Sequence, residues 1–357
     1  MWIVPVVLLA LTAAVPLIWG EPQVYRFGVV LIFLVAALGL HILVNWAGEV
    51  SLAHAGLFGL PAFAVLAVSS TRNISPVYLL PFGVAIGALT GAVLALPALR
   101  SRGIQVALVT LVAGIAIDRF LLTQDWLVGG VPRTAPPVTI GPLEITTSRG
   151  LYPFLVLMCV LSVVFVALLH RSKVARGWFW TRANPDAAAA FGIPVVRYRI
   201  LAYTVSGVLA GLGGALYAIW VPSFGRGAVP TTISFSFLLI VVIGGHGVFR
   251  GVAAATILLQ GGEQFTSQIF GTQAAEVIDA LLVYGGPIGL ISVITKHPAG
   301  LTGLGYELAE KLHLHKRATT HVPPAAEPPR AAADSGTGGS DHVLSSDAGP
   351  VRGGARP

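Results

Sequence analysis

The sequence predicts an all-α polytopic membrane protein, with about ten transmembrane helices or half-helices in one bundle and a disordered C-terminal tail. Of the 357 residues, 55% are hydrophobic and only 10% are charged, whereas about 25% of the residues in a soluble protein are charged. A helix that crosses the bilayer needs roughly 20 predominantly apolar residues. Stretches that approach this length lie at about 3–19, 24–44, 51–70, 77–97, 103–122, 151–170, 200–220, 233–243, 251–268 and 276–295.

These stretches indicate one transmembrane domain over residues 1–314. The first stretch has no Lys or Arg before Ala14, and the next apolar run follows closely. We therefore interpret it as a retained first helix and not as a secretory signal. From about His315 onward the sequence turns to Pro, Ala, Gly, Ser and charged residues, which bury too little apolar surface to offset the entropy of ordering. Residues 315–357 are predicted to form a disordered cytoplasmic tail.

The net charge of +7 is concentrated in one loop, at Arg171, Lys173, Arg176, Arg182, Arg197 and Arg199. The positive-inside rule places such a loop in the cytoplasm, although a cationic loop can also simply lie against anionic lipid head groups. If the predicted membrane crossings are counted in both directions from this loop, six further basic residues lie on the same side: Arg100, Arg102, Arg250, Lys296, Lys311 and Lys316. Three charged residues lie on the outside: Arg72, Asp125 and Arg133. Ten crossings then leave both termini in the cytoplasm.

Two segments depart from a uniform apolar helix, and irregular backbone at membrane depth needs protein or a water-filled cavity around it. The first is 45–56, NWAGEVSLAHAG, where polar and small residues interrupt two apolar runs. A helix broken here would offer amide donors to an anionic or zwitterionic substrate. The candidate residues of a translocation path in this segment are Asn45, Glu49, Ser51 and His54. Capping or a hydrogen bond between helices is the alternative role of His54, and Ser51 is also a candidate N-cap of the third helix.

The second segment is 243–251, IGGHGVFRG, which follows an apolar run of about 11 residues. That run is short for a full span and predicts a tilted helix or a half-helix inside the protein. The glycines suit a tight turn or a close backbone contact, and Gly244 and Gly245 are further candidates for the path. We expect His246 to be a hydrogen-bonded turn residue, because no second metal ligand lies at a suitable spacing.

The sequence lacks the motifs of several classes of enzyme. Lysines stand only at 173, 296, 311 and 316, and none completes a G-x-x-x-x-G-K-[ST] phosphate loop, so we expect no ATPase site of its own. H-E-x-x-H, G-x-S-x-G and paired-carboxylate arrangements are also absent from the sequence. The single cysteine, Cys159, supports neither a disulfide framework nor a zinc site. We expect a non-enzymatic protein with no cofactor and no bound metal, and no nucleic acid as a partner.

Several stretches, in order along residues 25–305, share motifs with one transporter family. They are NWAGEVSLAHAGLFG (45–59), LRSRGIQVALVTL (99–111), WLVGGVP (126–132), RGWFWTRANPDAAAAFGIPVVRYRILAYTVSGVLAGLGGALYA (176–218), IVVIGGHGVFRG (240–251) and PIGLISVITKHPAGLTGL (287–304). Together they resemble the branched-chain amino acid permease family of ATP-binding-cassette (ABC) transporters, specifically its longer subunit type. The chain departs from that family at Glu49, where glutamine is usual, at Ala189, where an acidic residue is usual, and at His246 and Arg250, where apolar residues are usual.

The resemblance implies that residues 171–199 form a cytoplasmic loop that couples the permease to an ATPase through a short helix at Arg182 to Gly192. By motif position the coupling residues are Arg182, Ala183, Asn184, Asp186, Ala187, Ala188, Phe191 and Gly192. The local sequence favours a helix here, because Ala187 to Ala190 have high helix propensity and Asp186 lies near the N-terminal end. Gly192 followed by Pro194 would end it. An ordinary amphipathic surface helix is the alternative.

The resemblance further implies a membrane subunit of a bacterial inner-membrane importer that takes up branched-chain amino acids. Its partners would be a second permease subunit, ABC ATPase subunits and an extracytoplasmic solute-binding protein, all within or beside the lipid bilayer. Three alternatives remain open. They are an ABC permease for urea or short amides, a secondary transporter or channel that needs no ATPase, and an accessory protein without a path of its own.

Overall fold

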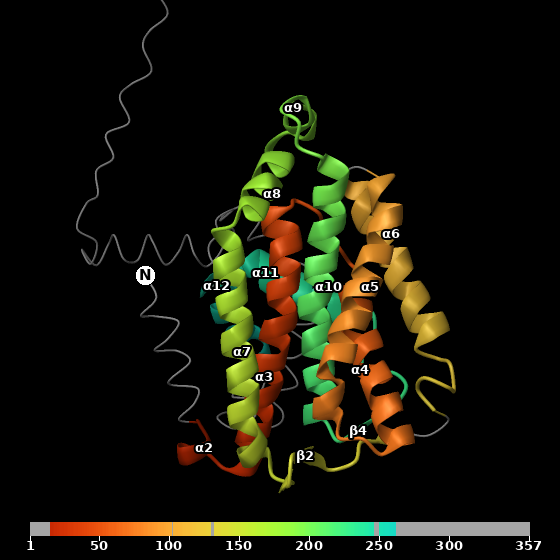
Figure 1. Cartoon of the computed structure of the whole chain (residues 1–357), viewed down its shortest axis with the longest axis vertical. Coiled ribbons are helices and arrows are strands. Elements are labelled where there is room, and N and C mark those ends of the chain that lie inside the picture. Colours follow the sequence, from red (N-terminus) through yellow and green to blue (C-terminus); the bar gives the residue numbers. More distant parts are fainter. Residues whose placement is uncertain (1–14, 102, 130–131, 246–249, 262–357) are drawn as a thin grey trace, which may run out of the picture. The chain divides into compact units, whose positions relative to one another are not determined.

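The computed structural model describes residues 15–101, 103–129, 132–245 and 250–261, and these residues are mostly helical (Figure 1). The predicted span at 276–295, the predicted tail at 315–357 and His246 lie outside the described residues, as does most of the first predicted span. The first described element is α2 (Val15–Ile18).

Among the described residues, five helical segments are long and apolar enough to cross a membrane. The first is α3 (Glu21–His41) with the π-helical turn η1 (Ile42–Trp46) that continues it. The others are α4 (His54–Arg72), the 3₁₀ turn η2 (Pro76–Leu79) with α5 (Leu80–Leu99), α7 (Ser148–His170) and α10 (Val195–Trp220). They confirm the predicted all-α polytopic membrane fold and the spans predicted at 24–44, 51–70, 77–97, 151–170 and 200–220.

Helix α10 packs against α3, α4 and α5, and α3 also packs against α7 (Figure 1). The crossing of α5 and α10 is possible because glycines face each other there. A Cβ atom on Gly87 would lie 2.3 Å from the carbonyl oxygen of Gly207, and one on Gly91 would lie 2.3 Å from the carbonyl oxygen of Tyr203. The glycine spacings along both helices therefore set how closely the helices approach.

Shorter apolar helices complete the described bundle. They are α6 (Ile104–Ala116) with its π-helical end η3 (Ile117–Leu121), α11 (Ile233–Gly244), and α12 (Arg250–Thr256) with η4 (Ile257–Gly261). The 12 residues of α11 extend about 18 Å, less than the roughly 30 Å of hydrocarbon that a full span crosses. The short helix predicted at 233–243 is confirmed.

The two ends of the bundle carry different elements (Figure 1). At the end that we call the basic end lie α8 (Lys173–Ala183) and α9 (Pro185–Ala190). At the opposite end, the hairpin end, β1 (Arg133–Thr134) pairs with β4 (Ser223–Phe224) and β2 (Val138–Ile140) pairs with β3 (Leu143–Ile145), both antiparallel.

Hydrogen bonds confirm that the loop of Arg100 lies at the same end as the basic loop and that Arg72 and Arg133 lie at the other end. Arg199 lies in the first turns of α10, which follows α9, and it donates to the carbonyl oxygens of Ala98 and Ser101. Arg133 at the other end donates to the hydroxyl groups of Ser70 and Thr71. The loop after α5 is thus at the basic end, and the loop after α4 is at the hairpin end.

Candidate functional site

Helix α8 is fixed to the bundle by one face. Its N-terminus is capped by the Ser172 hydroxyl, which accepts from the Ala175 amide. Trp178 is fully buried, and its indole N–H donates to the carbonyl oxygen of Tyr198 at 2.8 Å. A Cβ atom on Gly177 would lie 2.0 Å from the Tyr198 ring. The glycine therefore lets α8 lie directly on the start of α10.

Helix α9 follows α8 after a break at Asn184. The side-chain oxygen of Asn184 accepts from the amides of Asp186 and Ala187 at 3.1 and 3.0 Å, which is the usual role of asparagine at an N-cap. Gly192 ends this segment with a φ of +80°, a conformation that glycine adopts without strain. The predicted helix within 182–192 is present, but Arg182 and Ala183 belong to the end of α8.

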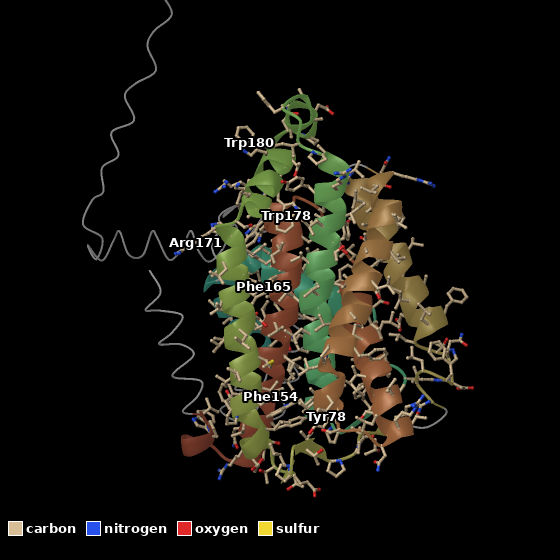
Figure 2. All side chains as sticks on the ribbon, viewed as in Figure 1. Tyr78, Phe154, Phe165, Arg171, Trp178 and Trp180 are labelled. Atoms are coloured by element: carbon tan, nitrogen blue, oxygen red, sulfur yellow. The ribbon has the colours of Figure 1, made fainter. Side chains whose placement is uncertain are left out.

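Large apolar side chains are exposed on α8 and after α9. Phe191 is 80% exposed and Trp180 is 59% exposed, and their ring centroids lie 6.5 Å apart. In Figure 2, Trp180 lies on the outer side of α8 whereas Trp178 points toward the bundle. Ala188 of α9 is buried. The loop thus presents an aromatic pair at the basic end, away from the core.

Asn45 connects the loop to a turn that lies 200 residues further along the chain. A guanidinium N–H of Arg182 donates to the backbone carbonyl oxygen of Asn45. The Asn45 side-chain amide in turn lies 3.1 Å from the carbonyl oxygen of Gly245, to which it donates, and 2.8 Å from Nδ1 of His41. Asn45 and Gly245, which were predicted to belong to one path, are in direct contact.

The glycines at 244, 245 and 251 shape that turn. Gly245 has a φ of +73°, and a Cβ atom on Gly251 would lie 1.8 Å from the carbonyl oxygen of Gly244. Helices α11 and α12 therefore meet backbone to backbone. The close contact predicted from these glycines is confirmed.

Glu49 forms an ion pair with Arg199. The Arg199 Nε and Nη2 atoms lie 2.6 and 2.9 Å from the two carboxylate oxygens of Glu49. Both side chains are largely buried, with exposed fractions of 12% for Glu49 and 18% for Arg199. Because Arg199 also donates to the loop after α5, this pair ties the segment before α4 to the start of α10 and the end of α5.

The segment between η1 and α4 is irregular, and its second half, residues 51–53, is largely buried in the protein. Its Leu52 amide donates to the Thr110 hydroxyl of α6 at 3.0 Å, and a Cβ atom on Gly114 would lie 3.0 Å from Cα of Ala53. Gly114 comes ten residues after the first residue of α6, which corresponds to about 15 Å along the helix. Neighbouring helices therefore supply the hydrogen bonds that this irregular backbone needs inside a membrane.

His54 and Ser51 are fully buried in this region. The His54 Nε2 atom lies 2.8 Å from the carbonyl oxygen of Ala36, and the imidazole packs edge-on against Phe237 with 5.2 Å between ring centroids. The hydrogen bond between helices that was the alternative for His54 is present. The prediction that Ser51 caps the third helix is wrong, because α4 begins at His54 with Ala53 as its N-cap.

Trp46 adds an aromatic contact between the loop and η1. Its ring centroid lies 5.1 Å from that of His170, 6.4 Å from that of Trp178 and 6.1 Å from that of Phe179. The end of α7, helix α8 and the turn that carries Asn45 therefore pack together as one aromatic cluster.

Sequence reasoning missed several of these polar partners. Thr110 of α6 and Ser234 of α11 are hydroxyl-bearing residues in apolar helices, and Ser234 accepts from the Ala55 amide, in the first turn of α4, at 2.9 Å. Asp118 accepts from the backbone amide and the hydroxyl of Thr231 at 3.2 and 2.8 Å. Polar residues within apolar helices were the available signal, since such residues often bond to a neighbouring helix.

The polar residues described above join helices to one another, and they do not form a grouping typical of a catalytic site. Within residues 15–101, 103–129, 132–245 and 250–261, no three His, Cys, Asp or Glu side chains gather in a way that could hold a metal ion. The polar groups at the basic end instead pair one helix with another, and the same contacts link an exposed loop to the centre of the bundle.

Comparison with known proteins gives one family. The family model described as "Branched-chain amino acid transport system / permease component" matches residues 24–286. The chain is 27% identical over 283 residues to the high-affinity branched-chain amino acid transport system permease protein LivM of Salmonella typhimurium, covering 71% of this chain and 65% of that relative. It is 27% identical over 285 residues to LivM of Escherichia coli strain K12, covering 71% and 66%.

A third relative is the probable branched-chain amino acid transport permease protein LivH of Methanocaldococcus jannaschii, which is 26% identical over 271 residues, covering 70% of this chain and 82% of the relative. The chain thus spans about two thirds of the length of the two LivM proteins. No solved structure gives a significant match.

Proposed function

Because the chain belongs to the family of branched-chain amino acid transport permease components, we propose that it is the membrane-spanning permease subunit of an ABC importer for branched-chain amino acids. ATP would be hydrolysed by partner subunits and not by this chain. The names of the relatives support the class of transporter and make leucine, isoleucine and valine the first cargo to test.

The basic end is proposed to face the cytoplasm of a bacterium, with the chain in the inner membrane. The support is the gathering of Arg and Lys in the loop of α8 and α9, since cytoplasmic loops carry an excess of these residues. An ATPase that binds this end would have access to cytoplasmic ATP.

The observation that carries the proposal is the surface of the loop at residues 171–199. Trp180 of α8 and Phe191, which follows the capped helix α9, are both exposed, and their rings lie side by side. Exposed aromatic residues are enriched at the centres of protein interfaces, where they fill pockets of the partner. We assign to this surface the docking of the ATPase, with the coupling residues 182–184, 186–188, 191 and 192.

The hydrogen bonds provide a route by which the loop would move the bundle. When the ATPase subunits close on ATP, a displacement of α8 would be felt at Asn45 through Arg182 and through the Trp46 cluster. Asn45 holds the Gly245 carbonyl oxygen, so the α11–α12 turn would move with it. ATP binding shifts the equilibrium between inward and outward states only if the two states differ in these contacts.

The path is proposed to pass the turn of Gly244 and Gly245 and the irregular segment before α4. Asn45 and Glu49 would hold that region in one of two arrangements through Gly245 and Arg199. Ser51 and His54 would support the broken backbone from within the protein. A second permease subunit would complete the path, and an extracytoplasmic solute-binding protein would deliver and select the cargo.

Uptake by a reconstituted complex tests this proposal. The chain would be co-expressed with a candidate second permease, ATPase and binding protein, and placed in proteoliposomes with radiolabelled leucine and ATP on the side of the basic end. We expect uptake that requires ATP and the binding protein. Uptake of urea or a nucleoside in place of leucine would contradict the cargo alone, whereas leucine transport without the ATPase would refute the importer class and favour a secondary transporter.

A further inference from the structure

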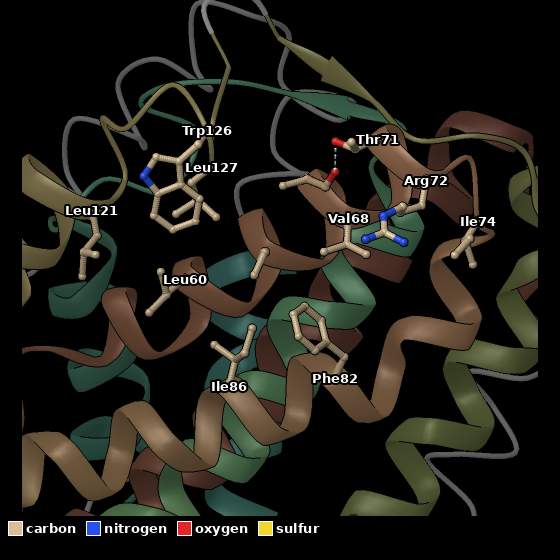
Figure 3. Close-up of a pocket in the computed structure, with 12 residues that line it drawn as sticks. Leu60, Val68, Thr71, Arg72, Ile74, Phe82, Ile86, Leu121, Trp126 and Leu127 are labelled. Carbon is tan, nitrogen blue, oxygen red and sulfur yellow. Dashed lines mark hydrogen bonds between the residues drawn. The ribbon is translucent and has the colours of Figure 1, made fainter.

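A cleft of about 660 Å³ lies between α4 and α5 near the hairpin end (Figure 3). Its walls are apolar: Leu60 and Val68 of α4 face Ile86 and Phe82 of α5. The volume falls within the roughly 300–1,000 Å³ of small-molecule sites. The outer face of α5 beside the cleft is also apolar and exposed, as at Leu89, so the cleft opens onto the surface that faces lipid or a partner.

Polar groups gather only at the rim of this cleft. Arg72 and Trp126 lie above the apolar walls in Figure 3. Within the part of the chain that the structure describes, no hydrogen bond or ion pair is found for the Arg72 guanidinium. A cation left without a partner beside an apolar cleft has the charge to receive an anionic group.

Arg133 holds the rim in place. Its guanidinium donates to the hydroxyl of Thr71 at 3.3 Å and to the backbone carbonyl oxygens of Asp125 and Trp126 at 3.3 and 3.1 Å. The loop that carries Trp126 is therefore fastened to the end of α4. The guanidinium of Arg133 is thus a second positive charge close to the mouth of the cleft.

We propose that this cleft binds an anionic phospholipid, with an acyl chain between α4 and α5 and the phosphate on Arg72. Guanidinium groups bind phosphate through paired hydrogen bonds, and tryptophan favours the depth of the lipid head groups. A zwitterionic amino acid fits less well, because the charged residue that lines the cleft is Arg72 and no carboxylate lines it to meet an ammonium group. The site is separate from the path proposed at the basic end.

Site-specific photo-crosslinking tests this inference. The photoreactive p-benzoylphenylalanine would replace Phe82, which lines the cleft and is 40% exposed. It would replace Phe120 in a matched control, because Phe120 is 71% exposed near the same end and does not line the cleft. The full-length chain, assembled with its partners, would be irradiated in nanodiscs of equal phosphatidylglycerol and phosphatidylethanolamine, and the adducts identified by mass spectrometry.

The adducts at position 82 should contain several-fold more phosphatidylglycerol than those at position 120. Arg72→Gln should abolish this enrichment, and Arg72→Lys should keep part of it. Arg119→Gln removes an arginine that also lies outside the cleft lining and should leave the enrichment unchanged. Equal lipid ratios at both positions, enrichment that survives Arg72→Gln, or an adduct at position 82 to the second permease in place of lipid would each overturn the proposal.

Discussion

At the residue scale, Asn45 connects parts of the chain that local sequence does not relate. Its backbone carbonyl oxygen accepts from Arg182, while its side chain donates to Gly245. A buried carbonyl oxygen that loses its donor costs about 1–3 kcal/mol. One asparagine therefore makes the position of the loop and the position of the α11–α12 turn depend on each other.

The ion pair of Glu49 and Arg199 is a second such contact, and it makes a prediction about stability. Glu49→Gln removes the charge that compensates a largely buried guanidinium, so we expect the free energy of unfolding to fall by about 1–3 kcal/mol. The value would be measured by denaturant titration in mixed micelles.

The pair of Glu21 and Arg149 provides a matched control. Their side chains are 44% and 51% exposed and lie 4.0 Å apart, so Glu21→Gln should change the same free energy by less than about 1 kcal/mol. Equal effects of the two substitutions would show that the Glu49 pair does not stabilise the fold as argued.

At the scale of elements, the short helix α9 depends on a single cap. Asn184→Ala removes the acceptor of two backbone amides and should destabilise α9 locally by about 1 kcal/mol. We expect faster amide hydrogen exchange in residues 186–190 and weaker binding of the ATPase subunits.

Asn184→Asp is the control for the cap, because aspartate accepts the same hydrogen bonds at an N-cap. It should restore both the protection from exchange and the binding. If Asn184→Ala leaves both unchanged, the cap does not organise the docking surface.

The close crossing of α5 and α10 depends on the glycines at their contact. A Cβ atom on Gly207 would lie 2.2 Å from the carbonyl oxygen of Gly87, so Gly207→Leu forces the helices apart and should lower the free energy of unfolding by at least about 1–3 kcal/mol. Leu89→Ala should have little effect, because Leu89 of α5 is 66% exposed. A stable Gly207→Leu protein would contradict the close crossing.

Most elements could be predicted from the sequence, whereas most of the contacts between them could not. Long apolar runs predict spans, and Gly245 with its neighbours predicts a turn, because both depend on local composition. The pairing of Asn45 with Gly245 depends on how distant helices pack. Trp178 and Trp180 show the same limit: they are two residues apart, and only the packing of α8 on α10 decides that the first is buried and the second exposed.

At the scale of the whole molecule, the described contacts form a continuous connection from the exposed loop to the centre of the bundle. The loop rests on α10 through Trp178, reaches η1 through Arg182 and reaches the α11–α12 turn through Asn45. Since packed helices move as rigid elements between discrete arrangements, pulling on the loop would shift several helices together. Coupling of an ATPase to the bundle, as proposed above, would use this connection.

The most direct test of this coupling is the number of leucine molecules imported per ATP hydrolysed by the reconstituted importer, for the unmodified chain and for Arg182→Gln. The control is Arg176→Gln, which removes another exposed arginine of α8. We predict that Arg182→Gln keeps ATP hydrolysis but lowers the ratio several-fold, and that Arg176→Gln does not. An unchanged ratio in Arg182→Gln, in a complex that assembles normally, would contradict coupling through the contact of Arg182 with Asn45.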